Sequence, residues 1–217
     1  MPKLRAHNIS MSLDGFAAGP DQDEDNPLGV GGRALHEWAF ATPSGRAMFG
    51  GDPPELTPGL EVDEAWWRAG DEGIGATIMG RNMFGPVRGP WPDHSWTGWW
   101  GPEPPYHHPV FVLTHHVRPA LELDGTTFHF VDGGIEAALE LAFAAADGAD
   151  VRVGGGASTV RQYLAAELLD DLHVAIAPLF LGRGERIFDD PAGLAGYGVT
   201  EVVQGAGATH VRIAKGG

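Results

Sequence analysis

The chain has 217 residues, of which 43% are hydrophobic and 20% charged, a composition typical of one folded domain and not of a disordered segment. Its 14 lysines and arginines stand against 29 acidic residues, and the net charge of −15 disfavours nucleic acids and anionic membranes as partners. The absence of cysteine excludes disulfides, thiolate metal sites and thiol nucleophiles.

The N-terminal residues bear on location. Residues 1–9 hold no apolar core of signal-peptide length, and no stretch reaches the roughly 18–20 apolar residues that span a bilayer. We therefore expect a single domain over residues 1–217 that stays in the cytoplasm and acts on a small-molecule substrate, with neither nucleic acid nor membrane as a partner.

The first part of the chain predicts short elements separated by long loops. Leu4 to Ile9 alternates as a strand and leads into Ser12-Leu13-Asp14-Gly15, where Asp-Gly is a strong turn signal. Pro20 to Gly32 is acidic, glycine-rich and aperiodic, which indicates a mobile surface loop. A short helix is expected over Ala34–Phe40, and prolines then interrupt regular structure until a longer helix opens at Asp63.

The middle of the chain alternates strands with one unusual loop. Ala76 to Met79 has the β-branched, apolar character of a buried strand and is stopped by Gly80-Arg81. Residues 85–109 are rich in proline and hold four tryptophans, and a loop of this length is usually functional or an interface. Two further strands are expected at Val110–Thr114 and Thr127–Val131.

The second half predicts helices and strands in clean alternation. Ile135 to Ala146 is rich in strong helix formers. The other expected elements are a strand at Val151–Val153, a helix at Ala157–Leu169, a strand at Leu172–Ile176, and a hairpin of Val199–Val203 with Thr209–Ile213. This order predicts a three-layer α/β fold, with a central mostly parallel mixed sheet, helices on both faces and a C-terminal β-hairpin.

Gly154-Gly155-Gly156 between a strand and a helix is the first candidate binding motif. Glycines there let the backbone approach a ligand, and the start of the helix attracts phosphate. The alternative is a tight turn that only requires positive φ. The motif is neither a Rossmann fingerprint nor a P-loop, since the third spaced glycine and the Gly-Lys-Ser/Thr sequence are missing.

Cationic residues follow two other predicted strands. Arg81 directly follows one strand, and Thr114, His115 and His116 follow the next, with Arg118 nearby. Ligands of open α/β sheets bind at the carboxyl ends of strands, so these side chains are placed to hold the 2′-phosphate of NADP.

The histidine pairs also suggest a metal site. Adjacent histidines on a strand point to opposite faces, so His107-His108 and His115-His116 would each offer one ligand to a given site, which disfavours zinc. A covalent hydrolase is disfavoured too, because the chain contains no Gly-x-Ser-x-Gly elbow.

Five motifs in order resemble the dihydrofolate reductase-like superfamily, and within it the branch of the RibD C-terminal (riboflavin biosynthesis) reductase domain. They are Ser12-Leu13-Asp14-Gly15, Met79-Gly80-Arg81, Val112-Leu113-Thr114, Val153-Gly154-Gly155-Gly156 and Pro178-x-x-Leu181-Gly182-x-Gly184. The resemblance covers residues 3–213 and implies a dihydrofolate reductase-like fold with NADPH as cofactor. It assigns to that cofactor Gly80, Arg81, Thr114, His115, Gly154, Gly155, Gly156, Ala157, Ser158 and Thr159.

The resemblance also suggests two catalytic acids. Asp63 lies three residues before Trp66, which is the local spacing of the acid in dihydrofolate reductases, although an acid early in a helix is ordinarily a partner of the helix dipole. Asp14 matches the Ser-Leu-Asp-Gly signature of riboflavin-type reductases, or else it belongs to a plain Asp-Gly turn. The deaminase half of the bifunctional riboflavin enzymes has no counterpart here.

We therefore predict an NADPH-dependent oxidoreductase that transfers a hydride to a small heterocyclic or ribosylaminopyrimidine-like substrate. The alternative is a catalytically idle nucleotide-binding or interaction protein that retains the fold. The tryptophan-rich loop suits a substrate lid or a dimer surface and, together with the resemblance, predicts a homodimer.

Overall fold

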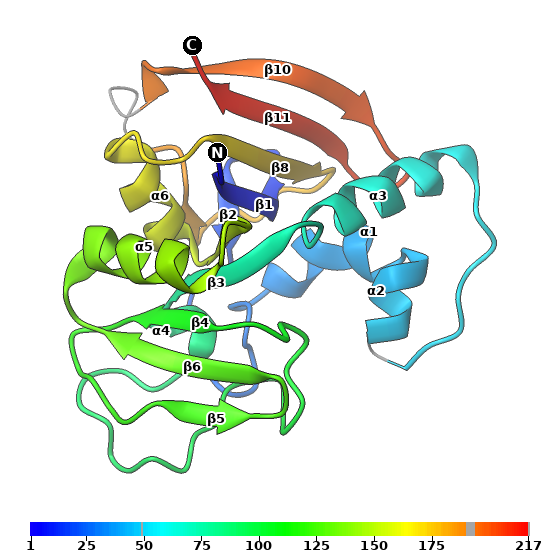
Figure 1. The fold of residues 1–217 in the computed structure, drawn as a ribbon. Helices are drawn as coiled ribbons and strands as arrows, with labels where there is room; N and C mark the ends of the chain where they lie inside the picture. Colours follow the sequence, from blue (N-terminus) through cyan, green and yellow to red (C-terminus); the bar gives the residue numbers. More distant parts are fainter. Residues whose placement is uncertain (49, 190–193, 217) are drawn as a thin grey trace.

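A nine-stranded mixed sheet runs through the centre of the computed structural model, which describes residues 1–48, 50–189 and 194–216 (Figure 1). Its order is β10-β11-β8-β1-β7-β3-β4-β6-β5. The strands are β1 (Leu4–Ser12), β3 (Ile74–Gly80), β4 (Val110–Leu113), β5 (Leu121–Leu123), β6 (Thr126–Val131), β7 (Asp150–Gly155), β8 (Asp171–Ala177), β10 (Tyr197–Gln204) and β11 (Thr209–Lys215). The strands from β8 to β6 pair in parallel, whereas β10, β11 and β5 pair antiparallel with their neighbours.

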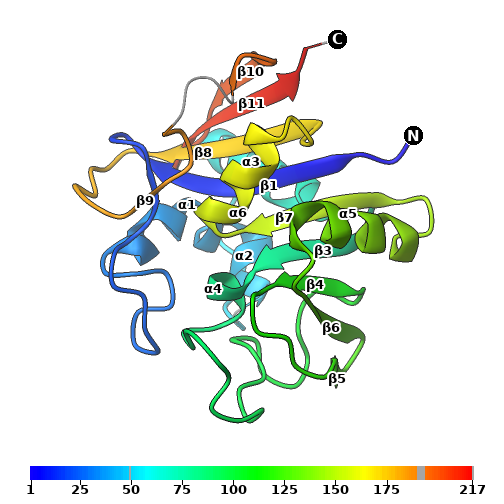
Figure 2. The same cartoon turned by 90° about the vertical axis from the view of Figure 1, so that its left-hand side faces the viewer.

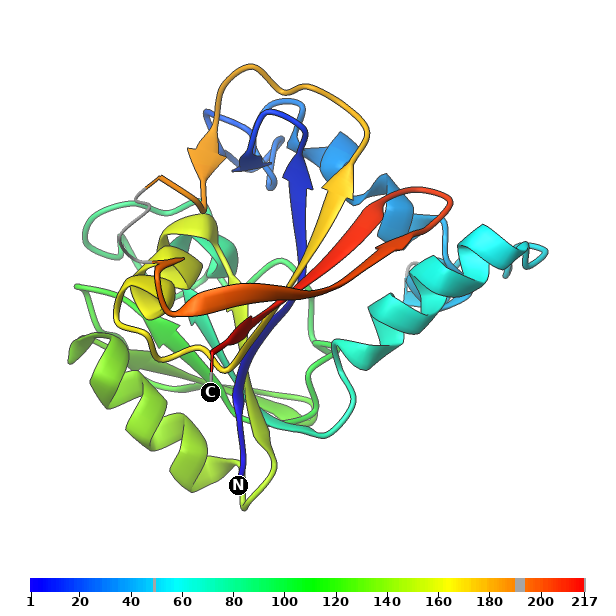
Figure 3. The ribbon, with the colours of Figure 1, turned by 90° about the horizontal axis from the view of Figure 1, so that it is seen from above.

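Helices cover both faces of the sheet. Figure 3 shows α5 and α6 on one side of β1 and β8, with α1, α2 and α3 on the other. The helices are η1 (Gly32–His36, a 3₁₀ helix), α1 (Glu37–Phe40), α2 (Pro43–Met48), α3 (Pro58–Ala69), α4 (Arg81–Phe84), α5 (Gly134–Ala145) and α6 (Ala157–Ala165). Two short strands, β2 (Phe16–Ala18) and β9 (Glu185–Arg186), pair as a separate small sheet. The predicted three-layer α/β class with a C-terminal hairpin is confirmed.

The two faces of the sheet differ in chemistry. Toward α5 and α6 the packing is aliphatic, with Ala138 and Ala142 of α5 fully buried against Val151 and Val153 of β7. Burying one such valine contributes about 1.5–3 kcal/mol, so this face supplies much of the folding energy. Toward α1 and α3 the sheet instead presents buried polar side chains, among them His173 of β8. Buried polar groups require partners, and Asp63, one of the two candidate acids, lies on this face.

The tryptophan-rich loop, residues 85–109, packs over the buried side chains of β4 and β6. Phe84 and Phe128 are fully buried beneath it, and Trp91, Trp96 and Trp100 pack against their cluster as half-buried rings. These rings are therefore not the exposed apolar patch on which the homodimer expectation rested, and the homodimer stays a prediction.

Several element boundaries differ from the sequence expectation. The longer helix begins at Pro58 and not at Asp63. Proline is tolerated at the first helical position, because the backbone N–H that it lacks would have no hydrogen-bond partner within the helix there. This start places Asp63 beyond the first turn, so the helix-dipole alternative is wrong. β7 extends through Gly155, and α6 ends at Ala165 instead of Leu169. Within the described ranges no helix is long and apolar enough to cross a membrane.

Candidate active site at the carboxyl edge of the sheet

The predicted binding motifs meet at one edge of the sheet. The parallel strands β1, β7, β3 and β4 all have their carboxyl ends at this edge. Helix α4, which follows β3, therefore lies close to α6, which follows β7 (Figure 2). The contact is tight at Gly80, since a Cβ on that residue would lie 2.4 Å from Thr159 Oγ1. Only glycine fits at this position, and the two predicted motifs are therefore parts of one surface.

The glycine turn leaves backbone open to a ligand. Gly155 has φ 124°, a conformation that L side chains rarely adopt, and its peptide bond to Gly156 is cis. A Cβ built on Gly156 has nothing within 4 Å. The backbone N–H of Thr159 donates the first hydrogen bond of α6, to Gly156 O. The amides of Ala157 and Ser158 come before it and make no hydrogen bond within the helix. Such a helix start is suited to an anion.

Two guanidinium groups contact one indole ring beside this turn. Arg81 Cζ lies 3.7 Å from the centre of a Trp91 ring, and Arg118 Cζ lies 5.1 Å from it. Nε and Nη2 of Arg81 and Nε of Arg118 are buried without a hydrogen-bond partner. Burial and the neighbouring Arg88 lower the pKa of Arg81. A buried donor without an acceptor is costly, and an anionic ligand would satisfy it.

The segment after β4 contributes less than expected. The Thr114 hydroxyl bonds the backbone N–H of His116 at 3.1 Å and is thereby used within its own turn. The His115 side chain is exposed. Trp91 Nε1 donates to His116 O, which ties the tryptophan-rich loop to this turn. The sequence offered little signal for Trp91 beyond its place among other tryptophans.

Asp14 joins two loops at the same edge. Its carboxylate accepts hydrogen bonds from the Ser12 hydroxyl and from the amides of Leu181 and Gly182, the latter two at 3.0 and 2.7 Å. The Ser12 hydroxyl and these amides lower the pKa of Asp14 to about 2. An ionised carboxylate held by three donors is placed to position loops and not to supply a proton. A catalytic role for Asp14 stays a prediction.

Asp14→Asn is expected to loosen the loop that follows β8. The amide cannot accept at both positions, so hydrogen exchange at the Leu181 and Gly182 amides should become faster. Because the folded pKa of Asp14 is depressed, its stabilisation is present above about pH 4 and is lost as pH falls toward 2. The Asn variant should lack this acid-dependent component. Exposed Asp147→Asn is the matched control, and unchanged exchange in Asp14→Asn would contradict the loop role.

Asp63 is fully buried and ends a chain of hydrogen bonds. Its Oδ1 lies 2.8 Å from His210 Nε2, and its Oδ2 accepts the Gly207 amide at 2.8 Å. His210 Nδ1 lies 3.0 Å from His173 Nε2, and His173 Nδ1 accepts the Asn8 amide at 3.1 Å. The chain thus joins α3 to the hairpin of β10 and β11 and to β1.

The direction of this chain follows from its first donor. Since the Asn8 amide occupies His173 Nδ1, a neutral His173 carries its proton on Nε2 and donates to His210, which in turn donates to Asp63. Burial and neighbouring His210 lower the pKa of His173 to about 2. Trp66 stacks on both imidazoles, at 4.4 and 5.5 Å between ring centres. Asp63 is therefore the buried acceptor of a structural network, and contact with a substrate stays a prediction for it.

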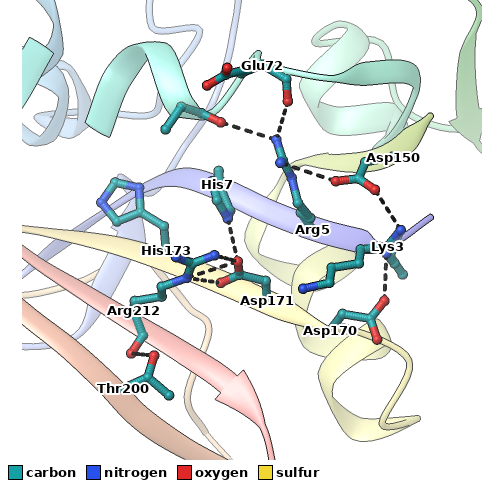
Figure 4. Close-up of polar contacts among 12 residues, drawn as sticks. Lys3, Arg5, His7, Glu72, Asp150, Asp170, Asp171, His173, Thr200 and Arg212 are labelled. Atoms are coloured by element: carbon teal, nitrogen blue, oxygen red, sulfur yellow. Dashed lines mark hydrogen bonds and ion pairs between the residues drawn. The ribbon is translucent and has the colours of Figure 1, made fainter. Parts of the chain in front are cut away.

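A separate charged cluster lies at the opposite end of β1 and β8 (Figure 4). Asp171 lies between His7 and Arg212, with 3.4 Å from its Oδ2 to His7 Nε2 and a bidentate pair to Arg212. Burial alone would raise the pKa of Asp171, but His7 and Arg212 hold it well below its usual range. The cluster adjoins the hydrogen-bond chain of Asp63, since the His7 ring lies 5.9 Å from that of His173.

The histidines do not converge on a metal. His108 Nε2 bonds Thr77 Oγ1 at 2.7 Å, whereas His115 is exposed at another strand end. Among residues 1–48, 50–189 and 194–216, no three side chains of histidine, aspartate or glutamate are grouped to hold a metal ion.

Comparisons with known proteins agree with this fold. The sequence profile of RibD C-terminal domains matches residues 3–204. A Shewanella sp. PV-4 protein assigned to riboflavin biosynthesis is similar in structure, with 20% identity and a TM-score of 0.58 over 99% of both chains. Dihydrofolate reductase from Enterococcus faecalis, solved with NADP(H) and RAB-propyl, has 14% identity and a TM-score of 0.53 over 98% of this chain and 96% of that one.

A bifunctional enzyme shares the same fold in part of its length. The Thermotoga maritima diaminohydroxyphosphoribosylaminopyrimidine deaminase/5-amino-6-(5-phosphoribosylamino)uracil reductase has 16% identity and a TM-score of 0.55 over 99% of this chain but 56% of that one. A search of curated proteins gave no match. The structural likenesses show a dihydrofolate reductase-like fold, as the motifs predicted.

Proposed function

Since the chain belongs to the family of RibD C-terminal domains, we propose that it is an NADPH-dependent reductase of a small heterocyclic or ribosylaminopyrimidine-like substrate. The observation that carries this proposal is the pairing, at one sheet edge, of an open glycine turn with two guanidinium groups that hold unpartnered buried nitrogens. A dinucleotide phosphate has two anionic parts, and this surface offers a place for each.

Residues of this edge suit the two phosphate groups of NADPH, the pyrophosphate and the 2′-phosphate. The pyrophosphate would lie against Gly155, Gly156 and the first amides of α6, where no side chain blocks the backbone. The 2′-phosphate would accept from Nε and Nη2 of Arg81 and from Nε of Arg118. Both Nη atoms of Arg118 already donate to backbone carbonyls, which hold that side chain in place. These cations supply the local positive potential that a chain of net charge −15 otherwise lacks.

When bound, NADPH supplies the hydride, and the protein supplies binding and orientation. Gly80 and Thr159, packed against each other, fix the spacing between the two anion sites. Asp14 keeps the loops after β1 and β8 together at the mouth of the site. The proposed substrate class is taken from two proteins that share the fold, a dihydrofolate reductase and a 5-amino-6-(5-phosphoribosylamino)uracil reductase.

Titration of the purified protein with NADPH and with NADH tests this function. We expect saturable quenching of tryptophan fluorescence by both cofactors, because Trp91 contacts Arg81 and Arg118 of the proposed site. The Kd for NADPH should be the lower one, because only NADPH has a 2′-phosphate for these arginines. NADPH oxidation is then followed with a panel of pterins, ribosylaminopyrimidines and simple carbonyls. Binding without any turnover favours the idle nucleotide-binding alternative, and no binding of either cofactor rules out the proposal.

We also propose a homodimer, now on a different surface from the tryptophan-rich loop. Val199 and Val202 of the edge strand β10 are 62% and 61% exposed, and an edge strand with exposed apolar side chains is a surface on which a second chain can pair. Light scattering at micromolar concentration should give twice the mass of 23.0 kDa. Val202→Lys should shift the protein toward the monomer, and a wild-type monomer mass excludes this proposal.

A further inference from the structure

His36 ends the 3₁₀ helix η1 and lies over β1, close to the edge that holds the proposed cofactor site. His36 is partly buried as a residue, and its Nδ1 lies 3.1 Å from Ser10 Oγ. Nothing in the described part of the chain bonds its Nε2. His36 was not among the residues that the sequence singled out, because neither a motif nor a periodicity marks it.

The hydrogen bonds around Ser10 fix the tautomer of His36. Trp38 Nε1–H, which can only donate, bonds Ser10 Oγ at 2.9 Å. Ser10 is 1% exposed, and its own O–H requires an acceptor, which His36 Nδ1 supplies. Nδ1 therefore carries no proton, and Nε2 carries the N–H. The free nitrogen of the ring is thus a hydrogen-bond donor.

The strand register brings this donor to the level of the glycine turn. β1 pairs with β7 at Arg5–Arg152, and β1 has one extra residue near Asn8. Since β1 and β7 are parallel neighbours, Ser10 near the carboxyl end of β1 lies at the same sheet edge as Gly155, which ends β7. His36 is bonded to Ser10 from the face covered by α1 and α3. η1 thus stands over β1 and β8 at the carboxyl edge, where open parallel sheets bind their ligands.

We propose that Nε2–H of His36 donates a hydrogen bond to the substrate atom that becomes negative on reduction, with Ser10 and Trp38 as positioning residues. The proposal rests on the reductase function above. In the reaction, the hydride and its two electrons form a new C–H bond at the carbon of a C=N or C=O group. The π electron pair moves to the nitrogen or oxygen, which then takes a proton from water.

His36 suits this task because it stays uncharged. Burial of the ring and the nearby Arg33 lower its pKa to about 4, so it is a neutral donor at physiological pH. A neutral imidazole stabilises a developing negative charge without first losing a proton, as is known for other enzymes. The Ser10–Trp38 bonds hold the ring in place before the substrate arrives.

Two measurements test this role. In ¹⁵N NMR of the ligand-free protein, His36 should show an unprotonated Nδ1 and a protonated Nε2, and Ser10→Ala should give a tautomer mixture. Single-turnover kinetics use NADPH and the compound of the pterin, ribosylaminopyrimidine and carbonyl panel that wild type reduces fastest. His36→Phe should slow hydride transfer about 10²–10³-fold, the range for losing one donor to a developing oxyanion. The Kd for NADPH should not change. His36→Gln, which keeps an N–H donor, should recover at least tenfold of that loss.

Exposed His94→Gln is the control for loss of any imidazole and should leave the rate unchanged. A protonated Nδ1 in wild type, or a His36→Phe rate within threefold of wild type, overturns the proposal. If His36→Phe does not fold, a His36→Gln rate reduced by the full 10²–10³-fold expected for loss of the donor overturns the proposal instead. Failure of wild type to bind NADPH defeats the reductase function and is recognised separately, since the tautomer measurement needs no cofactor.

Discussion

Arg81→Ala is expected to raise the Kd for NADPH about 10- to 150-fold while changing the Kd for NADH much less. The loss corresponds to about 1.5–3 kcal/mol, the range for a hydrogen bond to a charged group. Nε and Nη2 of Arg81 are buried without partners, so a phosphate that reaches them needs no competing bond to be broken. Isothermal titration of both cofactors at one fixed salt concentration measures the difference.

Two further variants sharpen this expectation. Arg81→Lys keeps the charge but loses the planar stack on Trp91, so it should recover only part of the affinity. Arg46→Ala removes an exposed arginine on α2 and controls for a general change in charge. Equal weakening of NADPH and NADH by Arg81→Ala would place Arg81 on the shared pyrophosphate, and no weakening would refute the placement of the cofactor.

Asp63→Ala is expected to lower the free energy of unfolding by about 2–6 kcal/mol, since two buried donors lose their acceptor at about 1–3 kcal/mol each. His210 Nε2–H and the Gly207 amide would both lose their acceptor in a fully buried site. Urea denaturation with an unchanged m-value measures the effect. Glu61→Ala, an exposed acid on the same helix, should cost less than about 1 kcal/mol.

The same variant separates the two roles considered for Asp63. If Asp63→Ala folds with wild-type stability but abolishes reduction, Asp63 contacts the substrate and the catalytic prediction holds. If stability falls as expected and the folded fraction still reduces the substrate, the carboxylate acts through the hairpin of β10 and β11. Asp63→Asn helps in this comparison, because it keeps the volume but turns one acceptor into a donor facing the Gly207 amide.

The sequence by itself determined the layout of the fold. Short β-branched runs stopped by glycine, such as Ala76 to Gly80, and alanine-rich helix formers, such as residues 135–146, are local signals that need no distant partner. Five short motifs in order were then enough to predict the fold family, since each carries a turn or strand end that the family requires. The missed elements, among them β5 and α2, are short and have no periodicity to detect.

Only the tertiary structure decided what the polar side chains do. His210 and Asp63 are 147 residues apart, and Leu181 and Asp14 are 167 apart, so no local pattern reveals that these pairs are bonded. Burial and partners set the protonation state of a carboxylate or an imidazole, and both depend on which strands become neighbours. For the same reason Arg81 gained its stack on Trp91, and His36 its bond to Ser10, only when the sheet brought their segments together.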